Sequence, residues 1–236
     1  MTVRLPPPDV PGPLGRVLAL SPHCDDAVLG CGDVLARLPG AVVVTFFAGA
    51  PPAGTGLTEW DAAAGFGPGD DVAAARRRED RAALACLGAT AAWLDFLDDQ
   101  YGEPPTTEAL QEALVTAVAT TAPDAVMAPL GLFHRDHRRL ADATLAAATH
   151  DRGRRWLLWG DALYRRYAGL LAERLAALRD AGVAVVPVAL DGRSASPRKR
   201  AAIACYASQL RALGTPGRPG TADALAEETL WEVRPA

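Results

Sequence analysis

The stretch RVLALSPHCDDAVLGCG, residues 16–32, joins an apolar run to a segment with a histidine and two adjacent aspartates. The run RVLAL (16–20) is predicted to be a short strand buried on both faces. A helix is predicted directly afterwards, over residues 27–38. Three ionisable side chains therefore lie at the end of a buried strand: His23, Asp25 and Asp26. Packing alone does not explain them, because the strand has no polar residue to pair with their charges.

The same alternation of strand and helix continues along the chain. Further strands are predicted over residues 41–48, 91–96, 124–130, 155–160 and 183–190, and further helices over 70–87, 106–121, 137–149, 161–180 and 197–213. This alternation is typical of a mostly parallel sheet with helices on both faces. We therefore predict a single Rossmann-like α/β domain over residues 1–236, with an extended proline-rich N-terminal tail over 1–15.

Two segments rich in glycine and proline interrupt the alternation. They span residues 48–71 and 213–223. Loops of this kind over an α/β sheet often close the active site, and a disordered excursion is an equally good interpretation.

The composition argues against nucleic acid and membranes as partners. The chain has 24 Lys and Arg against 28 Asp and Glu, so its net charge of −4 offers no attraction to nucleic acid or to an anionic membrane surface. No apolar stretch approaches the ~20 residues that a membrane helix needs, and the N-terminal segment has too much proline for a signal peptide. The four cysteines show no metal-binding spacing and are interpreted as reduced thiols. We expect a cytoplasmic protein that binds no nucleic acid and inserts into no membrane, and its oligomeric state stays open.

A second polar cluster, FHRDH at residues 133–137, directly follows the predicted strand 124–130. In the common strand order 3-2-1-4-5 the first and fourth strands are neighbours, and ligands bind where the strand order reverses. The two polar clusters are therefore expected to converge on one crevice at the carboxyl edge of the sheet.

Together the two clusters predict a metal site. His23 and Asp26 are three residues apart, so a first helical turn puts them on one face. With His137 they make a set of two histidines and one carboxylate, which leaves one zinc position open for water. Either motif alone is more often a helix cap with a histidine nearby. Both motifs together, each after a buried strand, favour the metal.

Three residues of the clusters stay outside this ligand set. Asp25 is free to act as a general base, and His134 as a hydrogen-bond donor or an acid. Asp136 can orient one of the histidines through a hydrogen bond.

Four motifs in order along the chain resemble one known family. SPHCDDAVLGCG (21–32) is similar to the signature of the LmbE/PIG-L family of zinc-dependent N-acetylglucosaminyl de-N-acetylases, and HRDH (134–137) resembles its second motif. RRREDRAALACLG (76–88) and KRAAIACYASQL (199–210) resemble two of its helices, and DALYRRY (161–167) lies where the family often has a tyrosine-bearing segment. The resemblance covers about residues 16–232.

The resemblance implies a role for each matching residue. The metal would be Zn²⁺, or another divalent ion such as Fe²⁺. The implied zinc ligands are His23, Asp26 and His137, the general base is Asp25, and His134 faces the oxyanion and the leaving amine. Arg76 matches an arginine that contacts substrate, and Asp98 matches a carboxylate that does the same.

The implied reaction removes an N-acyl group, with N-acetyl as the first expectation, from an amino-sugar-containing small molecule or glycoconjugate. Water activated by the metal attacks the amide with Asp25 as base. The sequence leaves open whether Asp25 or His134 protonates the amine. Ala27 stands where many members of the family have glutamate, so the substrate class also stays open.

Three other functions are considered, and the sequence excludes one of them. A dinucleotide-binding oxidoreductase is rejected, because GCGDVL (30–35) has Leu35 where the third glycine of the phosphate-binding motif belongs. An amidase acting on a thiol conjugate or a lipid-linked acyl amine is the closest alternative. A catalytically silent metal-binding module is a further one, although the presence of Asp25 argues against it.

Overall fold

The structure is a computed structural model that describes residues 14–190 and 195–234. A seven-stranded sheet forms its centre. The strands are β1 (Val17–Ser21), β2 (Val42–Thr45), β3 (Thr90–Trp93), β4 (Ala125–Pro129), β5 (Arg155–Trp159), β6 (Ala184–Val188) and β7 (Leu230–Arg234). All five residues of β1 and of β4 are buried, as expected for strands covered on both faces. Of the predicted N-terminal tail, residues 1–13 lie outside the described part of the chain.

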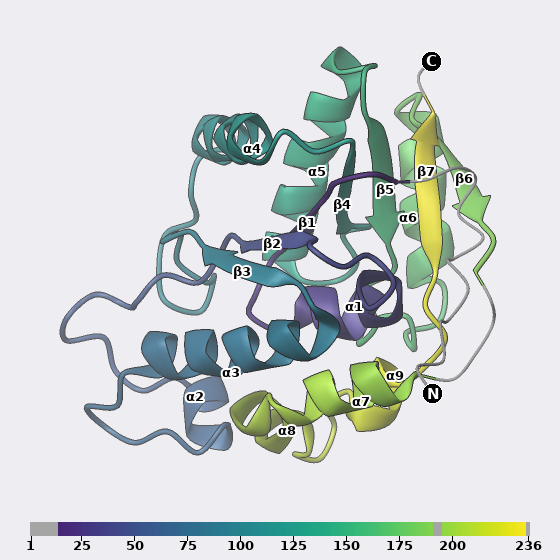
Figure 1. Cartoon of the computed structure of the whole chain (residues 1–236). Coiled ribbons are helices and arrows are strands. Elements are labelled where there is room, and N and C mark those ends of the chain that lie inside the picture. Colours follow the sequence, from purple (N-terminus) through teal and green to yellow (C-terminus); the bar gives the residue numbers. More distant parts are fainter. Residues whose placement is uncertain (1–13, 191–194, 235–236) are drawn as a thin grey trace.

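The strand order is β3-β2-β1-β4-β5-β7-β6 (Figure 1). The pairs β1–β2, β2–β3, β1–β4 and β4–β5 are all parallel. The predicted Rossmann-like, mostly parallel sheet is therefore confirmed, and β1 and β4 are neighbours where the order reverses. One strand was not predicted: β7 inserts antiparallel between β5 and β6.

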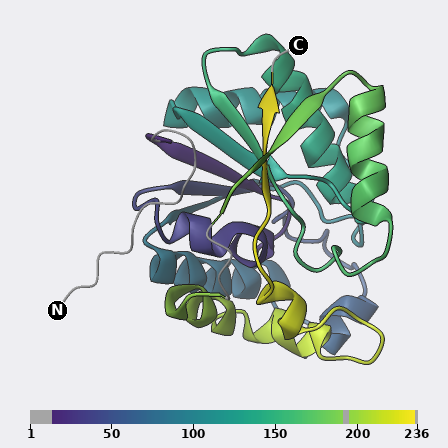
Figure 2. The ribbon, with the colours of Figure 1, turned by 90° about the vertical axis from the view of Figure 1, so that its right-hand side faces the viewer.

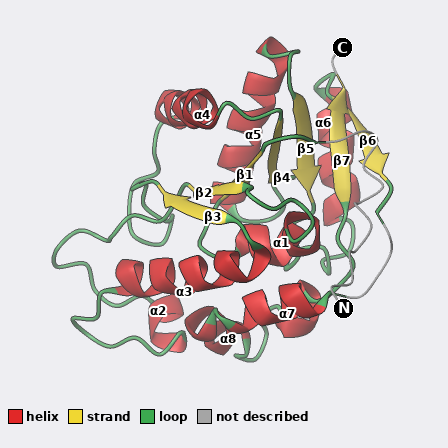
Figure 3. Ribbon diagram, in the orientation of Figure 1, coloured by secondary structure: helices red, strands yellow, loops and turns green. Residues whose placement is uncertain are grey.

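Helices cover both faces of this sheet (Figures 2 and 3). They are α1 (Asp26–Leu35), α2 (Glu59–Ala63), α3 (Val72–Leu87), α4 (Thr107–Thr121), α5 (Arg135–His150), α6 (Leu170–Asp180), α7 (Pro197–Ala204), α8 (Ala207–Leu213) and α9 (Thr221–Ala224). One hydrophobic core lies between the sheet and α1, α3 and α7, and a second lies between the sheet and α4, α5 and α6. Within the described residues, no helix combines the length and hydropathy needed to cross a membrane.

Two predicted helices differ from the structure. The helix expected over 161–180 begins only at Leu170, because the Asp161 carboxylate instead accepts the backbone N–H groups of Gly131 and Leu132. The helix expected over 197–213 is divided into α7 and α8. The division lies at Tyr206, whose buried hydroxyl donates to Asp80 at 2.7 Å.

Close packing under the first motif sets the position of α1. Gly30 lies against the indole ring of Trp159 on β5, and a Cβ atom at this glycine would be 2.3 Å from the ring. The helix also has a kink at Cys31, where φ is −143°. The contact with Trp159 explains why a glycine occupies this position, since any larger side chain would push α1 away from the sheet.

Candidate active site

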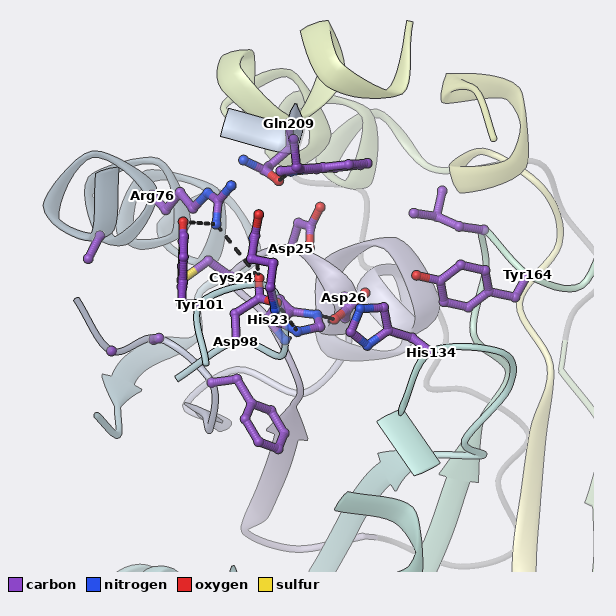
Figure 4. A pocket seen from close by; sticks show the side chains of 17 residues that line it. His23, Cys24, Asp25, Asp26, Arg76, Asp98, Tyr101, His134, Tyr164 and Gln209 are labelled. Carbon is purple, nitrogen blue, oxygen red and sulfur yellow. Dashed lines mark hydrogen bonds and ion pairs between the residues drawn. The ribbon is translucent and has the colours of Figure 1, made fainter. Parts of the chain in front are cut away.

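The two polar clusters meet at the carboxyl edge of the sheet. β1 ends at Ser21, and the chain then passes His23 and Asp25 before α1 begins at Asp26. On the neighbouring strand, β4 ends at Pro129 and α5 begins one residue after its cap, His134. The imidazole rings of His23 and His134 are 4.9 Å apart, centre to centre (Figure 4). The expected convergence of the two clusters is therefore observed.

One carboxylate oxygen of Asp26 lies close to a ring nitrogen of each of the two histidines predicted as ligands. The Asp26 Oδ2 atom is 3.1 Å from His23 Nδ1 and 3.0 Å from His137 Nε2. Ligand atoms around a tetrahedral zinc with bonds of about 2.0 Å are about 3.3 Å apart, so both separations fit. The Nε2 atom of His137 is buried, and its contact with Asp26 Oδ2 does not have the geometry of a hydrogen bond. A close nitrogen–carboxylate contact of this kind is expected where a metal would be held between the two atoms.

Two further groups of donor atoms overlap this set. His23, His134 and His137 offer nitrogens within 4.8 Å of one another, and so do the donor atoms of His23, Asp98, His134 and Asp136. These residues can hold a divalent metal. The predicted set has Asp26 in place of His134, and Asp26 Oδ2 lies 3.1 Å and 3.0 Å from the two remaining histidines.

Carboxylates hold the outer sides of the histidine rings. Asp136 Oδ2 lies 3.1 Å from His23 Nε2, so the orienting contact expected of Asp136 is made to His23. Asp161 Oδ1 lies 2.5 Å from His137 Nδ1. The sequence interpretation missed Asp161, although an acidic residue directly after the buried strand β5 is the same signal that marked the first two clusters. Such contacts set the tautomer and direction of a ligating ring.

The adjacent carboxylates Asp25 and Asp26 have opposite electrostatic environments. Burial and the neighbouring charge of Asp26 raise the pKa of Asp25 to about 7. Burial acts to raise the pKa of Asp26 too, but its contacts with His137 and His23 outweigh burial and hold it well below its usual range. Asp26 is thus anionic as a ligand must be, whereas Asp25 is able to exchange a proton near neutral pH.

His134 is held as a neutral ring. Burial, together with the nearby charges of His23 and His137, lowers its pKa to about 4. Its Nδ1 accepts the backbone N–H of Asp136 at the start of α5. Because a neutral imidazole then has its proton on Nε2, that N–H remains as a hydrogen-bond donor for the pocket that His134 lines.

A pocket of about 180 Å³ opens beside these residues. It contains both predicted substrate contacts, Arg76 from α3 and Asp98 from the segment after β3 (Figure 4). The sequence interpretation assigned no role to four other residues of its lining: Trp60, Tyr101, Tyr164 and Gln209. Tyr164 and Gln209 lie in segments that resemble family motifs, whereas Trp60 and Tyr101 lie in no motif. The glycine-rich segment 48–71 contributes to this wall through α2, as expected of a loop that closes the site.

Ala27, which departs from the commonest form of the first motif, does not line the pocket. Its side chain is buried in the core beneath α1, and its backbone N–H donates to Ser21 Oγ at 3.0 Å.

Comparison with known proteins agrees with the motifs. The model of the family described as "PIG-L: GlcNAc-PI de-N-acetylase" matches residues 18–148. No curated protein matches the sequence.

Three solved structures illustrate the likeness. A triple mutant of a deacetylase of the teicoplanin biosynthetic pathway is 26% identical with a TM-score of 0.75, over 94% of this chain and 98% of that one. The pseudoaglycone deacetylase Dbv21 is 29% identical with a TM-score of 0.71, over 94% and 97%. N,N'-diacetylchitobiose deacetylase from Pyrococcus horikoshii is 18% identical with a TM-score of 0.55, over 94% and 84%, and shows the fold alone.

The family match begins inside β1 and ends inside α5, so it contains both polar clusters and the strands that position them. It also spans more than half of the chain, and the chain therefore belongs to the PIG-L family of GlcNAc-PI de-N-acetylases.

Proposed function

We propose that this protein is a zinc-dependent hydrolase that removes an N-acyl group, N-acetyl in the first instance, from an amino-sugar-containing small molecule or glycoconjugate. One observation carries the proposal. Asp25, a carboxyl group with a pKa raised to about 7, lines the same pocket as His23 and Asp26, two of the proposed metal ligands, but is not itself one of the ligands. Membership of the family supports an amide as the bond that is cleaved.

His23, Asp26 and His137 would hold the metal. The chemistry of the set fits, because imidazole and carboxylate are donors that zinc accepts, and the buried Nε2 of His137 makes no hydrogen bond that a metal would have to replace. A zinc ion held there lowers the pKa of water and polarises a carbonyl group.

Asp25 takes a proton from the attacking water in this proposal. The residue is almost entirely buried, yet it lines the pocket, so its carboxylate is exposed to the substrate and little else. A base whose pKa lies near the working pH both accepts and returns a proton readily. Asp25 is therefore also the group that hands the proton to the leaving amine.

His134 stabilises the charge that develops on the amide oxygen. A ring with a pKa lowered to about 4 is neutral at pH 7 and makes a poor proton donor to the amine. Its Nε2–H is instead suited to a hydrogen bond with the oxyanion. In this proposal Asp25, and not His134, protonates the leaving amine, a choice that the sequence leaves open.

The test is hydrolysis by protein loaded with one equivalent of zinc. We expect free amine and acetate from at least one of N-acetylglucosamine, N,N'-diacetylchitobiose and an aryl N-acetylglucosaminide. Asp25→Asn should keep zinc and lose roughly 10²- to 10⁴-fold in kcat, since it removes a base and no ligand. Asp95→Asn, which changes an exposed aspartate outside the pocket, is the matched control.

The alternatives predict other results. Amine release only from a thiol conjugate or a long-chain acyl amine would replace the amino sugar by those substrates. A zinc-loaded protein that hydrolyses none of the five compounds would be a silent metal-binding module, and the proposed function would be wrong.

A further inference from the structure

The positive charge of the pocket is already matched by a carboxylate. Among the described residues that line the pocket, Arg76 is the only lysine or arginine. Its Nη2 lies 2.6 Å from Asp61 Oδ1, and its Nη1 lies 3.3 Å from the Tyr101 hydroxyl and 3.9 Å from Asp98 Oδ2. The guanidinium thus faces two carboxylates before any substrate enters.

Asp61 is fixed in place on the helix α2. Only 2% of the surface of Asp61 is accessible to solvent. The Tyr101 hydroxyl contacts its Oδ2 at 2.9 Å and its Oδ1 at 3.1 Å. Its backbone N–H donates to Thr58 Oγ1, the cap of α2. A substrate anion cannot displace Asp61 from Arg76 without leaving a buried carboxylate unpaired, which is strongly unfavourable.

The balance of charge on this wall is negative. Asp26 offsets one of the two charges of a divalent metal, and Asp25 offsets the other once it has released its proton, so the far wall decides how a charged substrate is received. That wall has Arg76 against Asp61 and Asp98. A phosphate or carboxylate placed there would meet more negative than positive charge and would lose its hydration.

The remaining polar groups of the wall are uncharged. Gln100 donates to Asp98 at 2.6 Å, and the Trp60 indole N–H donates to Gln209 at 3.0 Å. Tyr101 completes the set (Figure 4). Amides, a phenol and an engaged carboxylate are suited to the hydroxyl groups of a sugar, which both donate and accept hydrogen bonds.

We propose that Asp61 is a specificity-determining residue, which neutralises Arg76 and so makes this wall a subsite for an uncharged sugar ring that rejects phosphorylated or carboxylated sugars. The inference rests on the proposed function, because it assumes that an amino sugar occupies the pocket. It goes beyond that function because it names the residue that decides whether a charged substrate is accepted. That residue contacts Arg76 and not the substrate.

The test compares N-acetylglucosamine with its 6-phosphate and its 1-phosphate on zinc-loaded protein. We expect the wild type to prefer the uncharged sugar by roughly tenfold or more in kcat/KM. Asp61→Asn frees the charge of Arg76 and should reduce that preference by about tenfold for at least one phosphate. Asp95→Asn breaks an exposed aspartate–arginine pair outside the pocket and should keep the wild-type ratio.

Several outcomes would overturn the proposal. A wild type that hydrolyses either phosphate as well as the uncharged sugar contradicts it, and so does a folded, zinc-loaded Asp61→Asn protein with the wild-type ratio. If Asp61→Asn does not fold, Arg76→Gln replaces it. That variant should raise the preference for the uncharged sugar, because it leaves the negative charge of Asp61 without its cation. An unchanged preference in kcat/KM overturns the proposal.

Failure of the proposed function is distinguishable from failure of this inference. If none of the sugars is hydrolysed, the function is wrong, and the same comparison is then made by calorimetric binding of the intact sugars. Preferential binding of the uncharged sugar, lost in Asp61→Asn, supports the subsite. Equal binding of all three sugars, or binding of none, removes it.

Discussion

Asp25 and Asp26 are neighbours in the chain, but their surroundings shift their pKa values in opposite directions. Asp26 lies between two histidines, whose contacts keep it ionised although it is buried. Asp25 has no such partner, and burial raises its pKa to about 7. Because their environments move the pKa values of these two adjacent acids apart, one site contains both an anionic ligand and a proton carrier.

The pKa of His137 is shifted in the opposite direction to that of Asp26, its partner. Burial acts to lower its pKa, but Asp26 and Asp161 outweigh burial and raise it to about 9. In the metal-free protein its ion pairs therefore stabilise the fold fully below the unfolded pKa of about 6.5, and this contribution is lost as the pH rises through about 9. A histidine must be neutral to bind a metal, so metal binding has to remove that proton.

We predict that metal-free protein releases at least about one proton per zinc ion bound at pH 7.5, and that its zinc affinity falls as the pH is lowered. Zinc titration in two buffers of different ionisation enthalpy measures the proton count. His137→Ala should bind zinc more weakly and release fewer protons. Tight zinc uptake without proton release would show that His137 is not protonated in the metal-free protein.

At the scale of elements, one buried carboxyl group joins α3 to its neighbours. Asp80 of α3 accepts the indole N–H of Trp93 on β3 at 2.8 Å and the hydroxyl of Tyr206 at 2.7 Å. Burial raises its pKa to about 6 in spite of these hydrogen bonds. Because α3 also contains Arg76, the position of the pocket wall depends on this junction.

The raised pKa of Asp80 gives a pH dependence with a definite sign. The folded protein binds the proton more tightly than the unfolded chain does, so the Asp80 contribution falls as the pH rises from about 4 to about 6 and is constant above that. The loss is roughly 3 kcal/mol for a shift of about two units. We expect Asp80→Asn to flatten this part of the curve in urea denaturation. An identical slope in both proteins would mean that Asp80 is ionised throughout.

At the scale of the whole molecule, a buried ion pair ties the C-terminal segment to the first motif. Lys199 of α7 is fully buried, and its Nζ lies 2.6 Å from Glu228 Oε1 and 2.9 Å from the carbonyl of Leu29 in α1. Glu228 also accepts the backbone N–H groups of Asp33 and Val34. The candidate site at one end of α1 is thus supported from a segment about 200 residues later in the sequence.

We predict that Glu228→Gln lowers the free energy of unfolding by about 3–5 kcal/mol, because it leaves the buried ammonium of Lys199 without a counter-ion. Urea denaturation measures the change. Glu227→Gln alters the exposed neighbour and should cost less than about 0.5 kcal/mol. Equal stability of the two variants would show that Lys199 does not depend on Glu228.

The sequence by itself determined the alternation of strands and helices, the place of the site and its family. These properties are local or follow from general rules. A continuous apolar run indicates a buried parallel strand, and polar residues directly after two such runs must meet where parallel strands end. The amino-acid sequence alone was therefore sufficient to select the residues of the two clusters: His23, Asp25, Asp26, His134 and His137.

The tertiary structure alone decided which distant residues complete the site. Asp61 pairs with Arg76, Asp161 contacts His137, and β7 inserts between two strands that precede it in the chain. The position of Asp161 directly after a buried strand is a local signal, but no local pattern says which residue each of these groups contacts, because each contact joins segments that meet only after the sheet has formed. The sequence placed a guanidinium and a metal site in one crevice. Which charge that crevice presents to a substrate was set by packing, since a carboxylate on α2 neutralises an arginine on α3 only once the fold has brought the two helices together.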